Sequence, residues 1–283
     1  MVRSQTLRGV LWMGGAVLSF SAMAIAAREL LAHMQPFQVL FLRSVVMLAI
    51  VLVVVAQADD PAIGTKRLRL HALRNLVHCG GQYCWVFAIG ALPLATVFAI
   101  EFTMPVWTAI LAAVLLGERL NRGRVVMLVL GLAGVLIILR PGFGFFQLAT
   151  LVALAAAFLY AGNMIATKRL SGSDSPLAVL FWMSVMQTPL SLVAALPQWV
   201  APPVSALPWI AVMGVGSYTA HYCMTRAFKL ADASVVVPID FVRLPLIAVV
   251  GAVFYKEPFD LWIIVGALVI FAGTYYSLRR ETR

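Results

Sequence analysis

One segment of the sequence occurs twice, and this repeat constrains the fold more than any other feature. Moving Gln82–Arg140 forward by 139 residues places it on His221–Arg279 without a gap. Apolar residues match easily by chance in such segments, but Glu101 also falls on Asp240. Because a carboxylate within apolar sequence is rarely matched by a second one, we predict that the chain consists of two homologous halves.

The composition places these halves in a membrane. The chain has 283 residues, of which 63% are hydrophobic and 11% are charged, whereas about a quarter of a soluble protein is charged. A hydrocarbon core of about 30 Å requires roughly 20 apolar residues in each helical span, and the apolar runs here have that length. The net charge of +10 would suggest nucleic acid in a soluble protein, but in a membrane protein it reports topology.

Apolar runs between charges and turn residues predict an all-α integral membrane protein with ten transmembrane helices, five in each half. The halves are residues 1–141 and 142–283. The predicted spans are Gly9–Ala27, Pro36–Ala56, Asn75–Ala91, Thr96–Gly117, Gly123–Leu139, Phe145–Thr167, Pro176–Leu196, Leu207–Thr225, Ala233–Tyr255 and Leu261–Leu278. The connections are short, and none is long enough to form a soluble domain.

The positions of lysine and arginine predict that both termini are cytoplasmic. Cationic loops are retained on the cytoplasmic side of the membrane. With the N-terminus inside, 16 of the 21 lysines and arginines fall on the inner side, and Arg28, Arg140 and Lys256 fall on the outer side. The remaining two, Arg43 and Arg243, lie within spans.

Five spans per half is an odd number, so the two halves must insert with opposite orientation and matched loops should exchange their charges. The basic loop Glu118–Arg124 carries three arginines, and its equivalent Glu257–Ile263 carries none. Conversely, the outer Phe87 corresponds to the inner Arg226. Inverted repeats of this kind give many alternating-access transporters a pseudo-two-fold axis, with the substrate at the repeat interface near the midplane.

The first span has the features of a secretory signal peptide, but we predict that it is retained. Basic residues precede it and small residues lie near its end. However, Met23 and Arg28 match Met164 and Arg169 at a spacing of 141 residues. This span is therefore the partner of a mid-chain helix that cannot be a signal.

Four ionisable residues are predicted at bilayer depth: Arg43, Glu101, Asp240 and Arg243. Such groups cost at least a few kcal/mol each and usually face a cavity or a partner. Asp240 and Arg243 are three residues apart on one helical face, so they can form an ion pair that is either functional or purely structural. Glu101 is placed near the outer interface, and for Arg43 the alternatives are substrate contact and extension to that interface.

Two further pairs, Gln82-Tyr83 and His221-Tyr222, occupy matched positions in the third and eighth spans. Each pair offers a polar group and an aromatic ring at similar depth, which suits a pocket for an organic substrate. The same side chains also form ordinary interhelical hydrogen bonds. We therefore treat them as candidate binding residues, with packing as the alternative.

Prolines interrupt the fourth and ninth spans beside the two carboxylates. Pro105, Pro238 and Pro245 release backbone carbonyls and permit a bend, which acts either as a hinge or as a static kink.

The sequence contains no motif for catalysis, for a metal or for a cofactor. It has no phosphate loop, no pair of zinc ligands on one helix and no nucleophile elbow. Cys79, Cys84 and Cys223 lie in apolar segments without disulfide or metal-ligand spacing. We therefore predict that the protein is not an enzyme and holds neither metal nor cofactor. A membrane enzyme or a lipid-handling protein is the alternative.

Two segments resemble the EamA domain of the drug/metabolite transporter superfamily. Pro105–Leu120 followed by Gly131–Ile137 resembles the signature of that domain, and a second copy extends from Lys256 to Gly273. Arg43, after Phe41-Leu42, resembles an arginine often found in the second helix of the family. The resemblance covers the whole chain as two tandem domains.

This resemblance implies a ten-helix transporter of small organic solutes in the bacterial inner membrane. Relatives of this organisation move amino acids, riboflavin, S-adenosylmethionine, acylcarnitines and nucleotide sugars. Asp240–Pro245 and Asp260–Trp262 are most similar to the branch of the riboflavin, S-adenosylmethionine and acylcarnitine-type carriers. Since Arg243 replaces Met104 in the second copy, the implied site is asymmetric.

Together these features predict a multi-pass secondary transporter that moves a small organic metabolite, such as an amino acid, riboflavin, S-adenosylmethionine or a carnitine-like solute, by alternating access. Its expected partners are this substrate, the lipid bilayer and, as a candidate coupling ion, the proton, but not nucleic acid. A monomer and a homodimer are both compatible with the sequence. The sequence leaves import and export open, as well as proton antiport, proton symport, exchange and facilitated diffusion.

Overall fold

The computed structural model describes residues 2–117, 121–139, 147–170, 172–231, 239–258 and 260–281. Within these ranges the regular structure is helical and contains no strand. Glu118, Arg140 and Pro238, on which parts of the sequence argument depend, lie outside the described residues.

The described helices follow the predicted spans, with the fourth span divided in two. The first half contains α1 (Val2–Leu31), α2 (Pro36–Gln57), α3 (Leu68–Ala91), α4 (Leu94–Glu101), α5 (Met104–Leu116) and α6 (Arg122–Leu139). The second half contains α7 (Leu148–Leu170), α8 (Pro176–Ala195), α9 (Leu207–Leu230), α11 (Arg243–Tyr255) and α12 (Leu261–Glu281), with short 3-10 turns at Leu196–Gln198 and Val204–Ala206.

Six helical stretches among the described residues are long and apolar enough to cross a membrane. They are Gln5–Leu31, Pro36–Gln57, Leu94–Leu116, Leu148–Leu170, Pro176–Gln198 and Leu261–Arg280, and Arg243–Tyr255 is a shorter apolar helix. The chain is thus a multi-pass membrane protein, although hydropathy alone does not identify all ten predicted spans.

Helix α3 corrects the predicted start of the third span. The helix begins at Leu68 rather than at Asn75, and Arg74 is buried within it instead of lying in a basic loop. The Arg74 side chain donates to Thr167 Oγ1 at 2.8 Å and to Asn75 Oδ1 at 3.2 Å. Because these polar partners come from the protein interior, a hydropathy pattern misplaces this end of the helix.

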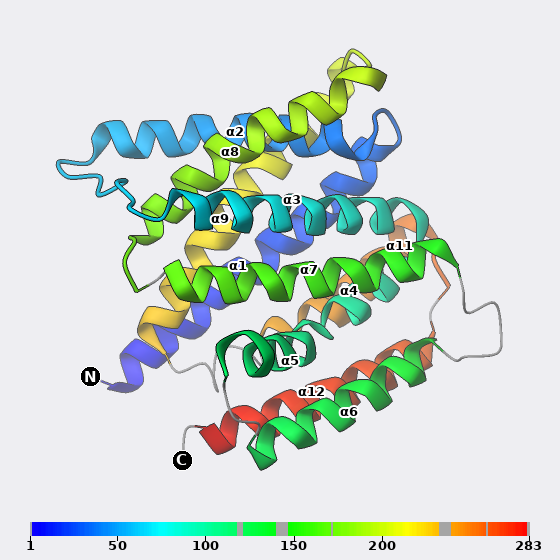
Figure 1. Ribbon diagram of the computed structural model, residues 1–283. Helices are drawn as coiled ribbons and strands as arrows, with labels where there is room; N and C mark the ends of the chain where they lie inside the picture. Colours follow the sequence, from blue (N-terminus) through cyan, green and yellow to red (C-terminus); the bar gives the residue numbers. More distant parts are fainter. Residues whose placement is uncertain are drawn as a thin grey trace.

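The helix pairs are unchanged when the two halves are exchanged. α1 is equivalent to α7, and α3 is equivalent to α9. α1 packs on α9 and α3 packs on α7, so exchanging the halves turns each of these pairs into the other. α2 packs on α8 and α6 on α12, and each of these pairs becomes itself. In Figure 1, α1 and α7, the first helices of the two halves, run in opposite directions. This arrangement fits the predicted pair of inverted repeats.

Close backbone contact between α6 and α12 follows the same symmetry. A Cβ atom built on Gly134 would lie 2.6 Å from the carbonyl oxygen of Gly266, and one built on Gly266 would lie 2.6 Å from that of Gly134. Gly273 is the repeat equivalent of Gly134, and it packs in the same way on the backbone of Met127. Small residues therefore allow these two helices to approach each other closely.

Both repeats interrupt a helix directly after the matched carboxylate. α4 ends at Glu101 and a turn leads into α5, while a turn at Phe241-Val242 leads into α11. The predicted interruptions near Pro105 and Pro245 are thus confirmed. Each proline lies in the first turn of the following helix, where its missing N–H group would have no intrahelical partner.

Two ends of the helix bundle are used as landmarks below. The terminal face contains both chain termini, at the lower left of Figure 1, together with the ends of α7 and α9 and the start of α6. The opposite face contains the ends of α1, α3 and α11. The charge distribution predicts that the terminal face is cytoplasmic.

Candidate functional site

Two carboxylates, one from each repeat, converge on a single arginine. Arg243 Nη2 lies 2.8 Å from Asp240 Oδ2 and 3.3 Å from Glu101 Oε1. The ion pair between Asp240 and Arg243 that the sequence predicts is therefore confirmed. The structure adds Glu101 from α4, which lies within the protein rather than at the outer interface.

The helix break places both carboxylates against this guanidinium, and aromatic rings enclose it. The Arg243 Cζ atom lies 4.9 Å from the ring centre of Phe20 and 5.3 Å from those of Phe98 and Phe102. Trp85 Nε1 donates to the second oxygen of Glu101 at 2.7 Å. These rings exclude water from one side of the cluster, which strengthens its charge interactions.

The pseudo-two-fold axis passes beside this cluster. Phe102 and Phe241 are repeat equivalents, and their rings are stacked with centres 4.3 Å apart. Trp85 corresponds to Met224, which has no N–H group to offer Asp240. The site is thus symmetric in its carboxylates and asymmetric in its donors.

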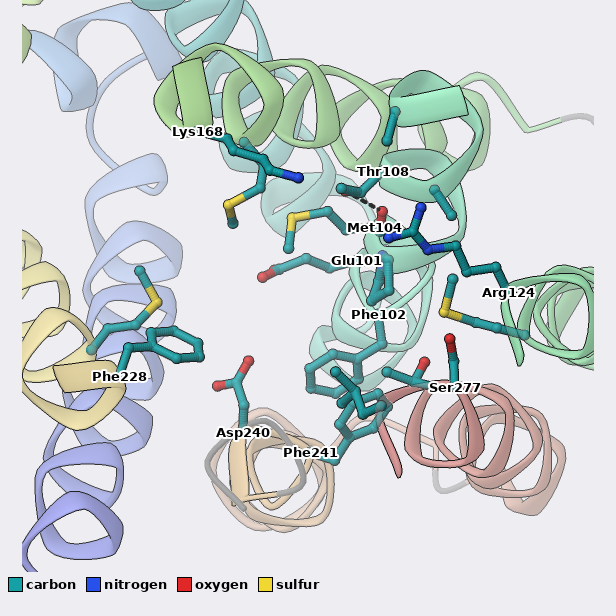
Figure 2. Close-up of a pocket in the computed structure, with 18 of the residues that line it drawn as sticks. Glu101, Phe102, Met104, Thr108, Arg124, Lys168, Phe228, Asp240, Phe241 and Ser277 are labelled. Carbon is teal, nitrogen blue, oxygen red and sulfur yellow. Dashed lines mark hydrogen bonds between the residues drawn. The ribbon is translucent and has the colours of Figure 1, made fainter. Parts of the chain in front are cut away.

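A vestibule of about 400 Å³ extends from the cluster toward the terminal face. Its inner end contains Glu101, Asp240 and Arg243. Its outer part is lined by Lys168 and Phe228, at the ends of α7 and α9, and by further residues from α5, α6 and α12. Figure 2 shows the Glu101 and Asp240 carboxylates pointing into this space.

A second, smaller cavity of about 150 Å³ continues inward from the same cluster, and we call it the central cavity. It shares Glu101, Asp240 and Arg243 with the vestibule. Its other polar lining residues are Arg43, His78, Gln82, Tyr160, Asn163 and His221. Met23 and Met164, which are repeat equivalents, also line it.

Arg43 lies at the part of the central cavity that the vestibule does not reach. Its side chain is 2% exposed, so it does not extend to the membrane interface. Nη2 donates to Gln82 Oε1 at 2.8 Å and to Gln187 Oε1 at 2.9 Å, and Nη1 donates to Ser217 Oγ at 3.2 Å. Among the residues that the structure describes, no carboxylate forms an ion pair with it.

Of the paired candidates, Gln82 and His221 line the central cavity, whereas the two tyrosines line neither cavity. Tyr83 stacks on Phe37 with ring centres 4.2 Å apart. Tyr222 stacks on Tyr218 at 5.9 Å and is 39% exposed. The matched position of the tyrosines in the repeats therefore does not bring them to the carboxylates.

Several residues of the site carry no recognisable signal in the sequence. Trp85 contacts Glu101 from another helix, and Gln187 and Ser217 reach Arg43 from the second half of the chain. These contacts join positions between 16 and 174 residues apart, so neither helical periodicity nor the repeat alignment could reveal them.

The opposite face is held together by a second set of charges. Arg28 forms an ion pair with Glu257 at 3.0 Å and donates to the carbonyl of Leu92 at 2.6 Å. Glu257 also accepts from the backbone N–H of Leu94 at 2.8 Å, and the Tyr255 hydroxyl donates to Glu29 at 2.7 Å. These contacts tie together the ends of α1, α3 and α11 and the start of α4, on the side away from the vestibule.

In the part of the chain that the structure describes, no three His, Cys, Asp or Glu side chains are grouped so as to hold a metal ion. The three cysteines are free thiols. Charged side chains gathered in a largely apolar cavity support charge recognition of a ligand.

Comparison with known proteins gives a family match over nearly the whole chain. A family described as the EamA-like transporter family matches residues 7–140 and 147–279. The chain is similar to a riboflavin transporter of Vibrio cholerae, with 29% identity over 100% of this chain and 96% of the relative.

Other relatives cover the chain to a similar extent. An S-adenosylmethionine uptake transporter of Rickettsia prowazekii is 25% identical over 98% of this chain and 94% of its own length. A pseudopaline exporter of Pseudomonas aeruginosa is 24% identical over 95% of both chains. A crystal structure with 20% identity matches with a TM-score of 0.67 over 97% of this chain and 99% of that chain, which supports the fold alone.

Proposed function

Because the chain belongs to the EamA-like transporter family, we propose that it is a secondary transporter that moves a small organic metabolite by alternating access, with its binding site at the interface of the two repeats. Family membership and the named homologues make it a membrane transport protein rather than an enzyme. The mechanism, the site and the cargo are the proposed parts. We further propose ten spans with both termini in the cytoplasm of a bacterial cell.

The observation that carries the proposal is the convergence of Glu101 and Asp240 on Arg243. These carboxylates are repeat equivalents, and they lie where the vestibule and the central cavity meet. A site that both repeats build is rearranged whenever the repeats move against each other. The proposed substrate-contacting residues are Glu101, Asp240, Arg243, Arg43, Gln82 and His221, while Tyr83 and Tyr222 have packing roles.

The shape of the molecule supports one state of such a cycle. The vestibule leads from the cluster toward the terminal face, whereas charged contacts around Arg28 and Glu257 join the helices at the opposite face. We assign this arrangement to a form that is open to the cytoplasm. To reach a form that is open to the outside, the protein would have to break the contacts around Arg28 and Glu257.

Transport by purified protein in sealed liposomes tests the proposal. Riboflavin, S-adenosylmethionine, amino acids and carnitine, each radiolabelled, form the panel, and protein-free liposomes provide the background. Saturable uptake that collapses when the vesicles are made leaky is the expected result for at least one solute. Chemical turnover of a solute in detergent, without a sealed compartment, would instead support a membrane enzyme. Transfer of labelled lipid between vesicles would support a lipid-handling protein.

A further inference from the structure

Four buried polar atoms without a hydrogen-bond partner among the residues that the structure describes belong to side chains that line the central cavity. They are Arg43 Nε, Arg243 Nε, Asp240 Oδ1 and Asn163 Oδ1. A buried polar atom without a partner is unfavourable, so native proteins rarely leave several in one place. Two of these atoms are donors and two are acceptors, so a ligand that satisfied all four would offer both kinds of group.

The charges of the cavity are separated along its length. At the junction with the vestibule, the two carboxylates Glu101 and Asp240 surround the single cation Arg243, which leaves an excess negative charge. In the part of the central cavity away from the vestibule, Arg43 has only neutral polar partners. This part therefore has an excess positive charge. With neutral histidines the cavity has no net formal charge, but it has a negative and a positive end.

Resting on the function proposed above, we propose that the cargo is a zwitterion, with a protonated amine that binds at Asp240 and Asn163 and an acidic group that binds at Arg43. An ammonium group supplies the N–H donors that Asp240 Oδ1 and Asn163 Oδ1 lack. An acidic group supplies the acceptor for Arg43 Nε and neutralises a buried guanidinium that has no carboxylate partner.

This assignment separates cargo classes that the family resemblance leaves together. A neutral flavin would satisfy hydrogen bonds but would leave both ends of the cavity uncompensated. A quaternary ammonium would balance the charge at Asp240 but has no N–H to donate. A solute with one charge would compensate one end and leave the other unpaired, which is costly in a low-dielectric site.

Matched analogues test the assignment directly. Three zwitterions of different size are used with purified full-length protein: L-tryptophan, 5-aminopentanoate and S-adenosylhomocysteine. Tryptamine and pentylamine lack the acid of the first two, indole-3-propionate and pentanoate lack their amine, and 5′-methylthioadenosine lacks the whole amino-acid end of the third. Dissociation constants are measured by calorimetry and by ligand-induced shifts in the melting temperature.

We expect at least one zwitterion to bind about tenfold or more tightly than each of its analogues. Arg43→Gln should remove the advantage over the acid-free analogue, and Asp240→Asn should remove the advantage over the amine-free analogue. Arg43→Lys and Asp240→Glu keep the charges and should retain part of the preference, even if the neutral variants fold poorly. Tyr83→Phe, which alters a ring outside both cavities, should leave all preferences unchanged.

The assignment is overturned if no zwitterion exceeds its analogues, or if riboflavin binds and the zwitterions do not. Saturable riboflavin flux in liposomes would then keep the transporter proposal while ending this one. Absence of flux for every solute of the transport panel would end the transporter proposal itself.

Discussion

Glu101 and Asp240 stand at the same place in the two repeats, 139 residues apart, and both lie against the same nitrogen atom of Arg243. One cation therefore compensates two carboxylates. Its removal leaves two unpaired acids, whereas removal of either acid leaves an ion pair intact.

Neutralising Arg243 should consequently destabilise the protein more than neutralising Asp240. Removing one partner of a buried ion pair costs about 3–5 kcal/mol, and we expect Arg243→Gln to fall in that range, with Asp240→Asn clearly below it. The free energy of unfolding in mixed detergent and the yield of monodisperse protein measure the difference.

The triple variant Glu101→Gln, Asp240→Asn, Arg243→Gln completes this test, since it removes every charge of the cluster together. It should recover the yield while transport stays lost. Wild-type flux from the triple variant would show that the cluster has only a structural role.

Trp85→Phe should lower the melting temperature of the protein more than Trp107→Phe does. The Trp85 indole donates to a carboxylate at 2.7 Å, while the Trp107 indole donates to the neutral Thr103 hydroxyl at 3.1 Å. Hydrogen bonds to charged groups contribute about 1.5–3 kcal/mol and neutral ones about 0.5–1.5 kcal/mol. Melting temperatures of the two variants provide the comparison, and equal shifts would contradict the importance of the Trp85 contact.

Breaking the contacts of Arg28 should open the opposite face. Val86 is fully buried and lines the central cavity, so a lone cysteine there, in a cysteine-free background, reports access. Arg28→Gln should increase its labelling by an impermeant thiol reagent applied from outside. Arg169→Gln is the repeat-equivalent control, and it should have no such effect because Arg169 is exposed at the terminal face. Equal labelling in both variants would refute a closing role for Arg28.

The orientation of the chain can be tested independently of any substrate. Lone cysteines at Gly64 and Asn121 should react only from the cytoplasmic side, and one at Ser205, in the exposed connection between α8 and α9, only from outside. Reaction of the Asn121 position from outside would overturn the assignment of the terminal face to the cytoplasm.

Gly134→Ala should destabilise the contact between α6 and α12. The new Cβ would lie 2.5 Å from Ile270 Cγ1 and 2.6 Å from a backbone oxygen, so the helices would have to separate. Gly14→Ala is the control, because no atom lies within 4 Å of that position and alanine favours a helix by about 1 kcal/mol. A lower melting temperature is expected for the first variant only. Similar behaviour of both would argue against close packing at Gly134.

The repeat alignment and hydropathy predict the helical architecture because both properties are local or periodic. The Asp240–Arg243 ion pair was predictable for the same reason, since a spacing of three residues places both on one helical face. The contact of Glu101 with Arg243 could not be predicted in this way, because it joins residues of different repeats. The start of α3 was also missed, since buried polar partners keep Arg74 inside the helix, whereas hydropathy places the start of the span after it, at Asn75.

The depth of a residue along its helix is easier to predict than the direction in which its side chain points. Gln82 and Tyr83 are adjacent and at similar depth, yet the first lines the central cavity and the second stacks on Phe37. Successive residues of a helix point about 100° apart, so two neighbours at one depth can face different surroundings.

Met104 stands in the first repeat where Arg243 stands in the second. If the two repeats were identical in sequence, the inward and outward forms of an alternating-access carrier would be related by the two-fold axis and would be equally populated when empty. A single guanidinium removes that equality, and a difference of about 1.4 kcal/mol between the two forms already gives a tenfold preference. The solute gradient still decides the direction of net flow. An arginine without a counterpart in the first repeat instead biases the side of the membrane to which the empty carrier opens.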